Sequence, residues 1–201
     1  MPPEPRAEPS GDARDDGPTV DLTPSAADLA NLVVRMTELA WPTTEAERLV
    51  FFGELGLHDA ESPRPDDSVP GAERRWFASD LAEGLGGTAT TFRGEFLGLT
   101  LFAYDEPVED GERARVGYAA VRDHVSKRLG PPLEEWGTAT EPACLWHPGP
   151  LMIDLYCFQR QQSGIMIGPG HADRSAAYDE AADAANAADA EGGSPEPDDR
   201  A

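Results

Sequence analysis

The chain is poor in basic side chains. Its 201 residues include 16 Lys or Arg against 38 Asp or Glu, which gives a formal net charge of -22, and Lys127 is the only lysine. Binding to nucleic acid or to an anionic membrane needs a positively charged surface. The composition therefore excludes both as expected partners, whereas a basic protein would be attracted and steered toward this chain.

Cysteines and long apolar runs are scarce as well. Cys144 and Cys157 are too few for a disulfide scaffold and too far apart for a CxxC redox motif. No apolar run approaches the roughly eighteen residues that a membrane span needs. The first residues lack the basic and apolar regions of a signal peptide. These absences predict a reduced, cytoplasmic protein without membrane contact.

Large apolar side chains are also missing from both ends of the chain. Residues 1–20 and 191–201 are mainly Pro, Asp, Glu, Gly, Ser and Ala, and such segments bury too little surface to offset the entropy of ordering. The sequence predicts a disordered acidic tail at 1–22, one domain at 23–170, and a weak Ala/Asp-rich helix with a disordered tail at 171–201. The 23–170 region alone carries 12 basic and 23 acidic residues, so the predicted domain is acidic in its own right.

Three helices are indicated before residue 131. In the first, Thr23 is the expected cap, Pro24 lies in the first turn, and an apolar stripe follows at helical spacing. In the second, Thr44 and Glu47 fit a capping box and Gly56 fits a helix end. A third helix is expected to open at Asp110 and to end at Gly130-Pro131-Pro132.

Two-residue periodicity predicts an antiparallel sheet of about five to six strands. A polar loop is expected at about 58–72, and the element order is α-α-β-β-β-α-β-β-β with a last helix near 172–190. This α+β pattern lacks βαβ units and hence the crevice of a doubly wound sheet. The expected strands are Arg75–Ser79, Thr88–Phe92, Phe96–Tyr104, Ala143–His147, Leu151–Phe158 and Ile165–Ile167.

Alternation divides the sheet into a leucine-rich face and an aromatic face. The leucine-rich face is expected to hold Leu97, Leu99, Leu101, Ala103, Leu151, Ile153 and Leu155. The aromatic face is expected to hold Phe92, Phe96, Thr100, Phe102, Tyr104, Tyr156 and Phe158. We expect the first two helices to cover the aromatic face and the third to cover the leucine-rich face. The alternative is that part of the aromatic face binds a partner, because Tyr and Phe are common interface anchors.

Catalytic and metal-binding signatures are weak. Zinc ligands could be drawn from Cys144, His147, Cys157 and His171, but cysteines on the apolar side of strands are usually small core residues. Gly84–Gly87 fits a turn rather than a phosphate loop, because no P-loop lysine follows it. No nucleophile elbow or catalytic-cysteine motif is present. We therefore expect no enzyme, metal or cofactor, with an unrecognised hydrolase as one alternative.

Several short motifs carry a family resemblance. The chain resembles small uncharacterised actinobacterial proteins in four segments: Trp41-Pro42, Phe52–Leu57, Leu129-Gly130-Pro131-Pro132 and Cys144-Leu145-Trp146. Those proteins in turn resemble the immunity proteins of polymorphic toxin systems. At the level of fold, the element order is also similar to type III secretion chaperones, which are acidic partner-binding proteins.

The functional prediction combines charge and resemblance. We expect a non-catalytic, protein-binding inhibitor of the toxin-immunity type that docks an acidic surface on a basic protein partner, such as a toxin. A secretion-chaperone-like or adaptor protein is the alternative. The expected partner-binding residues follow the long strand and the third helix, where loops present side chains on a rigid frame. They are Asp105, Glu106, Glu109, Asp110, Glu134 and Glu135.

Overall fold

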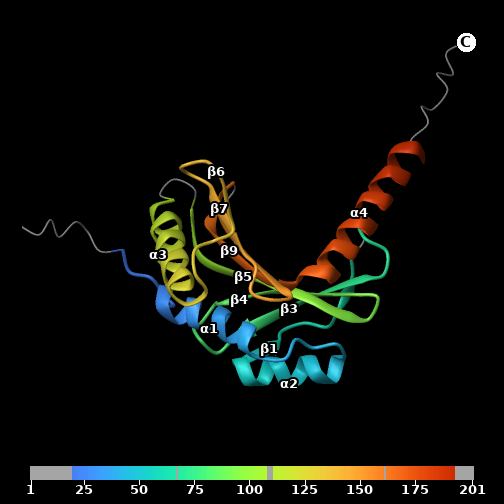
Figure 1. Cartoon of the computed structure of the whole chain (residues 1–201), viewed down its shortest axis with the longest axis horizontal. Helices are drawn as coiled ribbons and strands as arrows, with labels where there is room; N and C mark the ends of the chain where they lie inside the picture. Colours follow the sequence, from blue (N-terminus) through green and yellow to red (C-terminus); the bar gives the residue numbers. More distant parts are fainter. Residues whose placement is uncertain (1–19, 67, 108–110, 161, 193–201) are drawn as a thin grey trace, which may run out of the picture.

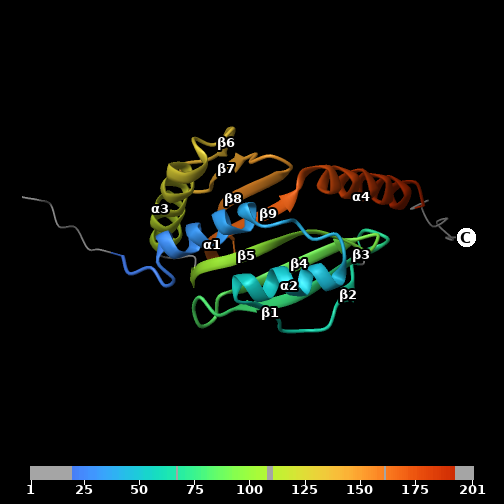
Figure 2. The same cartoon turned by 60° about the horizontal axis from the view of Figure 1, so that its bottom comes forward.

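The computed structural model describes residues 20–66, 68–107, 111–160 and 162–192. In these ranges it contains four helices and one antiparallel sheet of nine strands (Figures 1 and 2). The sheet order is β1-β3-β4-β5-β9-β8-β7-β6, and β2 pairs with β3. The strands are β1 (Leu57–Asp59), β2 (Arg64–Pro65), β3 (Ala72–Ser79), β4 (Gly86–Phe92), β5 (Glu95–Pro107), β6 (Glu134–Gly137), β7 (Pro142–Trp146), β8 (Leu151–Gln159) and β9 (Gln162–His171).

The predicted α+β class and antiparallel sheet are confirmed, but the predicted number of strands is wrong. β1 and β2 lie inside the predicted polar loop, and β6 follows the helix-ending prolines. All four residues of β6 are exposed, and β1 buries only Leu57. A strand with solvent on both sides shows no alternation of apolar and polar residues, so periodicity could not reveal these three.

The helices are α1 (Ala26–Glu38), α2 (Glu45–Leu55), α3 (Glu112–Leu129) and α4 (Ala172–Gly192). The capping box of α2 is confirmed, and its C-cap Gly56 is left-handed with a φ of 66°. The cap of α1 is Ser25, whose side chain accepts a hydrogen bond from the Asp28 N–H, instead of Thr23. α3 has Gly111 as its N-cap, and the predicted opening residue Asp110 lies outside the described residues.

One face of the sheet is covered by α1, α2 and α3. The apolar stripes of these helices and the inward side chains of the central strands form one continuous core. Leu101, Ile153 and Ile167 are fully buried in it. Its helical members include Leu29, Val33, Met36, Phe51, Phe52, Val121 and Val125. We call this side of the sheet the covered face.

The alternation along β5 is interrupted at both ends, which corrects the predicted faces. The β4–β5 register shifts between Thr90 and Thr91, and the β5–β9 register shifts between Ala103 and Glu106. Each shift is a β-bulge, which moves the following side chain to the other face. Phe96 and Tyr104, predicted on the aromatic face, therefore lie in the covered core, whereas Leu97 lies on the opposite side.

Tyr104 shows how one of these irregularities is held. Its backbone has a φ of 60°, which is uncommon for a residue other than glycine. Its hydroxyl donates a 3.0 Å hydrogen bond to the Pro24 carbonyl. The ring lies against Gly117 of α3, where a Cβ atom would collide with it. Burial raises the pKa of Tyr104 to about 12. These contacts join β5, α3 and the segment before α1.

The expectation that α1 and α2 cover the aromatic face is wrong, because both pack on the covered face with α3. Only α4 packs on the other side, and only near one end of the sheet. Tyr178 meets Phe92 edge-to-face with ring centroids 5.7 Å apart, in a small separate cluster with Val69 and Ala72. Beyond these contacts α4 projects from the sheet (Figure 1). We call the side of the sheet that faces away from α1–α3 the open face.

The base of α4 is fixed by one arginine. Arg174 donates hydrogen bonds of 2.7 Å and 2.6 Å to the carbonyl oxygens of Pro42 and Phe96 and forms a 3.2 Å ion pair with Glu95.

α4 contains no membrane-spanning stretch, and no other helix in the described ranges is long and apolar enough to cross a membrane. The predicted disordered segments at 1–20 and 191–201 fall almost wholly outside the described residues.

Candidate functional site

The open face carries an apolar and aromatic surface that no helix covers along the central strands. Trp76 of β3 lies against Phe102 of β5 with ring centroids 6.0 Å apart, and Trp136 of β6 lies against Tyr156 of β8 at 5.6 Å. Trp76 is 46% exposed and Trp136 is 42% exposed. Met152, Phe158 and Met166 add further partly exposed apolar side chains. An apolar surface of this extent on one sheet face is typical of a binding surface.

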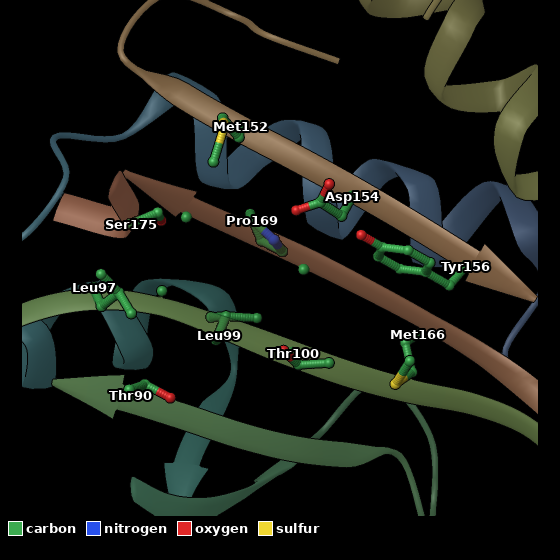
Figure 3. A pocket seen from close by; sticks show the side chains of 13 residues that line it. Thr90, Leu97, Leu99, Thr100, Met152, Asp154, Tyr156, Met166, Pro169 and Ser175 are labelled. Carbon is green, nitrogen blue, oxygen red and sulfur yellow. The ribbon is translucent and has the colours of Figure 1, made fainter. Parts of the chain in front are cut away.

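Two hollows lie on this face. The larger has a volume of about 690 Å³ and is lined by the aromatic side chains of Trp76, Phe102 and Phe158, together with Asp105. The smaller has a volume of about 240 Å³ and contains Met152, Asp154 and Tyr156 of β8 (Figure 3). We call them the aromatic groove and the Asp154 pocket. Tyr156 and Met166 border the second, and their neighbours Phe158 and Phe102 border the first.

Glycines on β9 make room for these hollows. On the open face β9 presents Gly164, Met166, Gly168 and Gly170, so most of this strand carries no side chain there. A Cβ atom at Gly164 would come within 2.9 Å of the Phe158 ring and would also collide with the Asp105 carboxylate. At Gly168 and Gly170, β9 is therefore the floor of a trough between the side chains of β5 and those of β8, whereas at Gly164 the Phe158 ring and the Asp105 carboxylate fill the space above the strand.

Asp154 is the charged residue of the smaller pocket. It projects from the middle of β8 opposite Gly168, and Figure 3 shows the Tyr156 hydroxyl beside it. Burial and, to a smaller extent, the negative charge of Asp179 on α4 raise the pKa of Asp154, a hydrogen bond from Tyr156 lowers it, and the net value is about 6. Among the described residues no Arg, Lys or His forms an ion pair with Asp154.

The six predicted acidic residues do not form one cluster. Asp105 lines the aromatic groove, and partial burial raises its pKa. Glu106 turns instead toward the start of α3, where its side chain accepts a 3.3 Å hydrogen bond from the Ala114 N–H. Glu109 and Asp110 lie outside the described residues. Of the two described residues, Asp105 and Glu106, Asp105 alone therefore adjoins the open face.

The other two predicted residues, Glu134 and Glu135, are exposed on β6 at the edge of the sheet. Glu135 is paired with Arg122 of α3. Arg122 lies about two turns along α3 from Ala114, the residue that Glu106 contacts. The predicted acidic surface is thus divided between separate points beside α3, and its role in binding stays a prediction.

The residues considered for zinc do not gather into a metal site. In the described part of the chain no group of three or more His, Cys, Asp or Glu side chains is arranged to hold a metal ion. Cys144 and Cys157 are free and buried in the covered core, and burial raises the pKa of the Cys144 thiol to about 11. A thiol in that environment packs as an apolar side chain. Gly84 lies in the turn before β4, as expected, with a φ of 78°.

Asp154 was not singled out from the sequence, although a signal was present. It is the only charged residue in an otherwise apolar strand whose other outward side chains are Met152, Tyr156 and Phe158. A carboxylate in that position costs free energy unless a partner compensates it. The trough was not foreseen because it depends on which strand pairs with which, and hence on β9 lying between β5 and β8.

Comparisons with known proteins give little to add. No protein-family model matches the chain, and no curated protein sequence matches it. One solved structure with a partial likeness is that of a cysteine-rich secretory protein from Staphylococcus aureus, with a TM-score of 0.36 and 12% sequence identity. The likeness covers 67% of this chain and 46% of that protein, so it spans less than half of the other protein's length. At this level a likeness does not indicate a shared function.

Proposed function

We propose that this chain is a non-catalytic protein-binding protein and that the open face is its binding surface. The observation that carries the proposal is the arrangement of the helices. α1, α2 and α3 all pack on the covered face, and the aromatic side chains of β3, β5 and β8 remain on the open face. Tyr, Trp and Phe in such surfaces are the side chains that dominate protein interfaces.

The charge of the chain favours a basic partner. Asp105 and Asp154 lie in the hollows of the open face, and the chain as a whole has a net charge of -22. Complementary charge speeds the encounter and selects the partner, while buried apolar contacts slow dissociation. An inhibitor of the toxin-immunity type that binds a basic toxin in the cytoplasm is one function of this kind, in line with the family resemblance.

A secretion-chaperone-like function is the second candidate. The trough over β9 favours it, because its floor lacks side chains at Gly168 and Gly170 and its sides are mainly apolar. Such a trough suits an extended segment of a partner, whereas a flat surface would suit a folded one. Both candidates use the open face, so the first experiment does not need to separate them.

The experiment compares one open-face variant with one matched control. The full chain is tagged and used to capture proteins from its native host, and the captured protein is identified, purified and titrated by calorimetry. Phe102→Ser removes an aromatic side chain from the open face. Val50→Ser removes an apolar side chain that is 63% exposed on α2. We expect at least a tenfold weaker affinity for Phe102→Ser and no change for Val50→Ser.

An equal affinity of wild type and Phe102→Ser would contradict the proposal and would direct the search to α2 and the covered side. The melting temperature of each variant is measured first. A variant that melts within a few degrees of wild type is folded, so its loss of affinity reports on the surface.

A further inference from the structure

We propose that the open face recognises an extended segment of its partner that places a Lys or Arg side chain in the Asp154 pocket and an aromatic or large aliphatic side chain in the aromatic groove. This inference rests on the proposed function and names the chemistry of the partner. It combines an apolar surface, two adjoining hollows of different chemistry and a carboxylate without a cation among the described residues.

The pocket around Asp154 fits the end of a basic side chain. Its volume of about 240 Å³ is small, and its walls include the thioethers of Met152 and Met166 and the ring of Tyr156. The long aliphatic stem of Lys or Arg packs well on such walls, while the charged end reaches a polar group. Asp154 with the Tyr156 hydroxyl supplies that polar end, and an entering cation would compensate a carboxylate that is now costly to ionise.

The register of the sheet sets the spacing of the two anchors. Phe158 borders the aromatic groove, but most of the groove is lined by β3, β4 and β5. Tyr156, Met166 and Phe102 lie in one row across β8, β9 and β5, and Asp154 is two residues from Tyr156 on β8. With strands about 4.8 Å apart and a rise of about 3.3 Å per residue, Asp154 and Phe102 are about 12 Å apart. An extended segment that reaches both hollows would therefore cross β9 at an angle and carry its basic and its aromatic anchor about three to five residues apart.

A second copy of this chain is a poor occupant. Its net charge is -22, so a symmetric contact through the open face would bring like charges together around Asp154 and Asp105. A C2 contact places the same patch on both subunits, and like charges across an interface are unfavourable. A basic segment of another protein has the opposite charge and removes the conflict.

The test selects peptides from a random twelve-residue display library on the immobilised full chain, at pH 7.5 and moderate salt. We expect enriched sequences with Lys or Arg three to five residues from an aromatic or large aliphatic residue. The best peptide is synthesised with blocked ends and titrated against four variants. Asp154→Asn removes the pocket charge, Glu54→Gln removes one exposed carboxylate from α2, and Phe102→Ser and Val50→Ser form the apolar pair.

We expect Asp154→Asn and Phe102→Ser each to weaken binding at least tenfold, and Glu54→Gln and Val50→Ser to change it less than twofold. Replacing the basic residue of the peptide by Gln should weaken binding to wild type but not to Asp154→Asn. Such non-additivity is the signature of a direct pair. Asp154→Asn is expected to fold well, since it removes only a charge.

The pH dependence of peptide binding gives a second measurement. The titratable groups facing Asp154 are Tyr156 on its own strand and Asp179 from α4, and the pocket residues from β4, β5 and β9 are not titratable. With a free pKa of about 6, Asp154 is mostly protonated at pH 5. The basic peptide should therefore bind wild type up to about tenfold more weakly at pH 5 than at pH 7.5, and Asp154→Asn should lack this dependence.

The outcomes separate the two proposals. Peptides that need Phe102 but show no preference for a basic residue would overturn this inference and leave the binding face in place. Failure to select any peptide that depends on Phe102 would count against both. Sedimentation velocity of the free chain tests whether a second copy of the chain occupies the open face. A dimer of wild type that Phe102→Ser dissociates would assign the open face to a second copy and overturn the proposed segment.

Discussion

The two sides of the sheet differ in how a buried charged side chain is paired. On the covered side, Arg48 of α2 is fully buried, and it donates hydrogen bonds of 2.7–2.8 Å to the carboxylates of Glu45 and Asp59. Burial by itself would lower the pKa of Arg48, but these hydrogen bonds raise it overall. On the open side, burial raises the pKa of Asp154, and its charged neighbour Asp179 is also acidic.

The difference separates stability from function. The Arg48 cluster is compensated within the chain and ties α2 to β1, and Arg75 of β3 joins it through Glu45 at 2.9 Å. Ionising Asp154 at neutral pH costs stability, and among the described residues the Tyr156 hydroxyl compensates its charge in part but no cation does. Groups that destabilise a fold in this way are concentrated at functional sites. Four measurements test this contrast.

The largest expected effect compares adjacent residues of β8 that point to opposite faces. Ile153→Ala should lower the free energy of unfolding by about 3 kcal/mol, because Ile153 is fully buried and leaves a cavity. Met152→Ala should cost less than about 1 kcal/mol, since its side chain is only partly buried. Urea denaturation monitored by circular dichroism measures both. Equal losses would show that the open face is packed as tightly as the covered one.

The second effect concerns the compensated charge. Arg48→Met should lower the free energy of unfolding by about 2 kcal/mol, because Glu45 and Asp59 lose one of the two cations that they share and keep only Arg75. The cost stays below that of a fully buried pair, since both carboxylates are partly exposed. Arg64→Met is the control, because Arg64 is mostly exposed and its ion pair with Glu61 also lies at the surface. Urea denaturation at pH 7.5 should show no loss for this control, and a loss equal to that of Arg48→Met would remove the special role of the cluster.

The third effect has the opposite sign. Asp154→Asn should stabilise the chain at pH 7.5 by about 1 kcal/mol and raise its melting temperature by about 2–4 °C. The folded pKa of about 6 exceeds the value of about 3.9 of an unfolded Asp, so the folded state holds more protons between these values and its stability falls as pH rises through this range. We expect only about 1 kcal/mol because the carboxylate is partly open to water, which screens its charge.

At pH 4.5 Asp154 is mostly protonated in the folded chain but still mostly ionised in the unfolded chain, so the advantage of Asp154→Asn should fall to about a third of its value at pH 7.5. Glu54→Gln, which removes an exposed carboxylate of α2, should leave the melting temperature unchanged at both values of pH. Calorimetric melting of the three proteins at pH 4.5 and 7.5 provides the measurement. A stabilisation that does not depend on pH would exclude the titration of Asp154 as its source.

The smallest expected effect concerns the exposed aromatics. Trp76→Ala should lower the free energy of unfolding by no more than about 0.5 kcal/mol, because Trp76 is nearly half exposed and its main contact is Phe102. The same substitution should weaken partner binding if the open face is the interface. A large loss of stability would instead identify the Trp76–Phe102 pair as part of the core.

Much of the covered side could be predicted from the sequence, and little of the open side could. The stripe of α3 at Ala114, Tyr118, Val121 and Val125 is buried as expected, because a helical period survives any arrangement of neighbours. Leu99 and Ile153 are also buried in one sheet, as the two-residue period indicates. The capping box of α2 is local chemistry and needs no knowledge of tertiary contacts.

The errors have a common physical cause. The placement of Phe96, Leu97 and Tyr104 depended on bulges in β5, and a bulge is set by the partner strand as much as by the residue itself. The face of the sheet on which α1 and α2 pack likewise depends on tertiary contacts and not on the local sequence. Asp154 acquires its unusual environment only when β9 and α4 lie beside β8, and no local pattern contains that information.

α4 packs on the body through its first three turns, with Arg174 and Tyr178 at its base and Ala181 and Ala182 against the same small cluster. The helix has 21 residues in all, so about 15 Å of it extends beyond Ala182. Asp179, the charged neighbour of Asp154, belongs to the packed part. The charge environment of the Asp154 pocket is therefore set by the packed turns of α4 and not by the direction of its outer half.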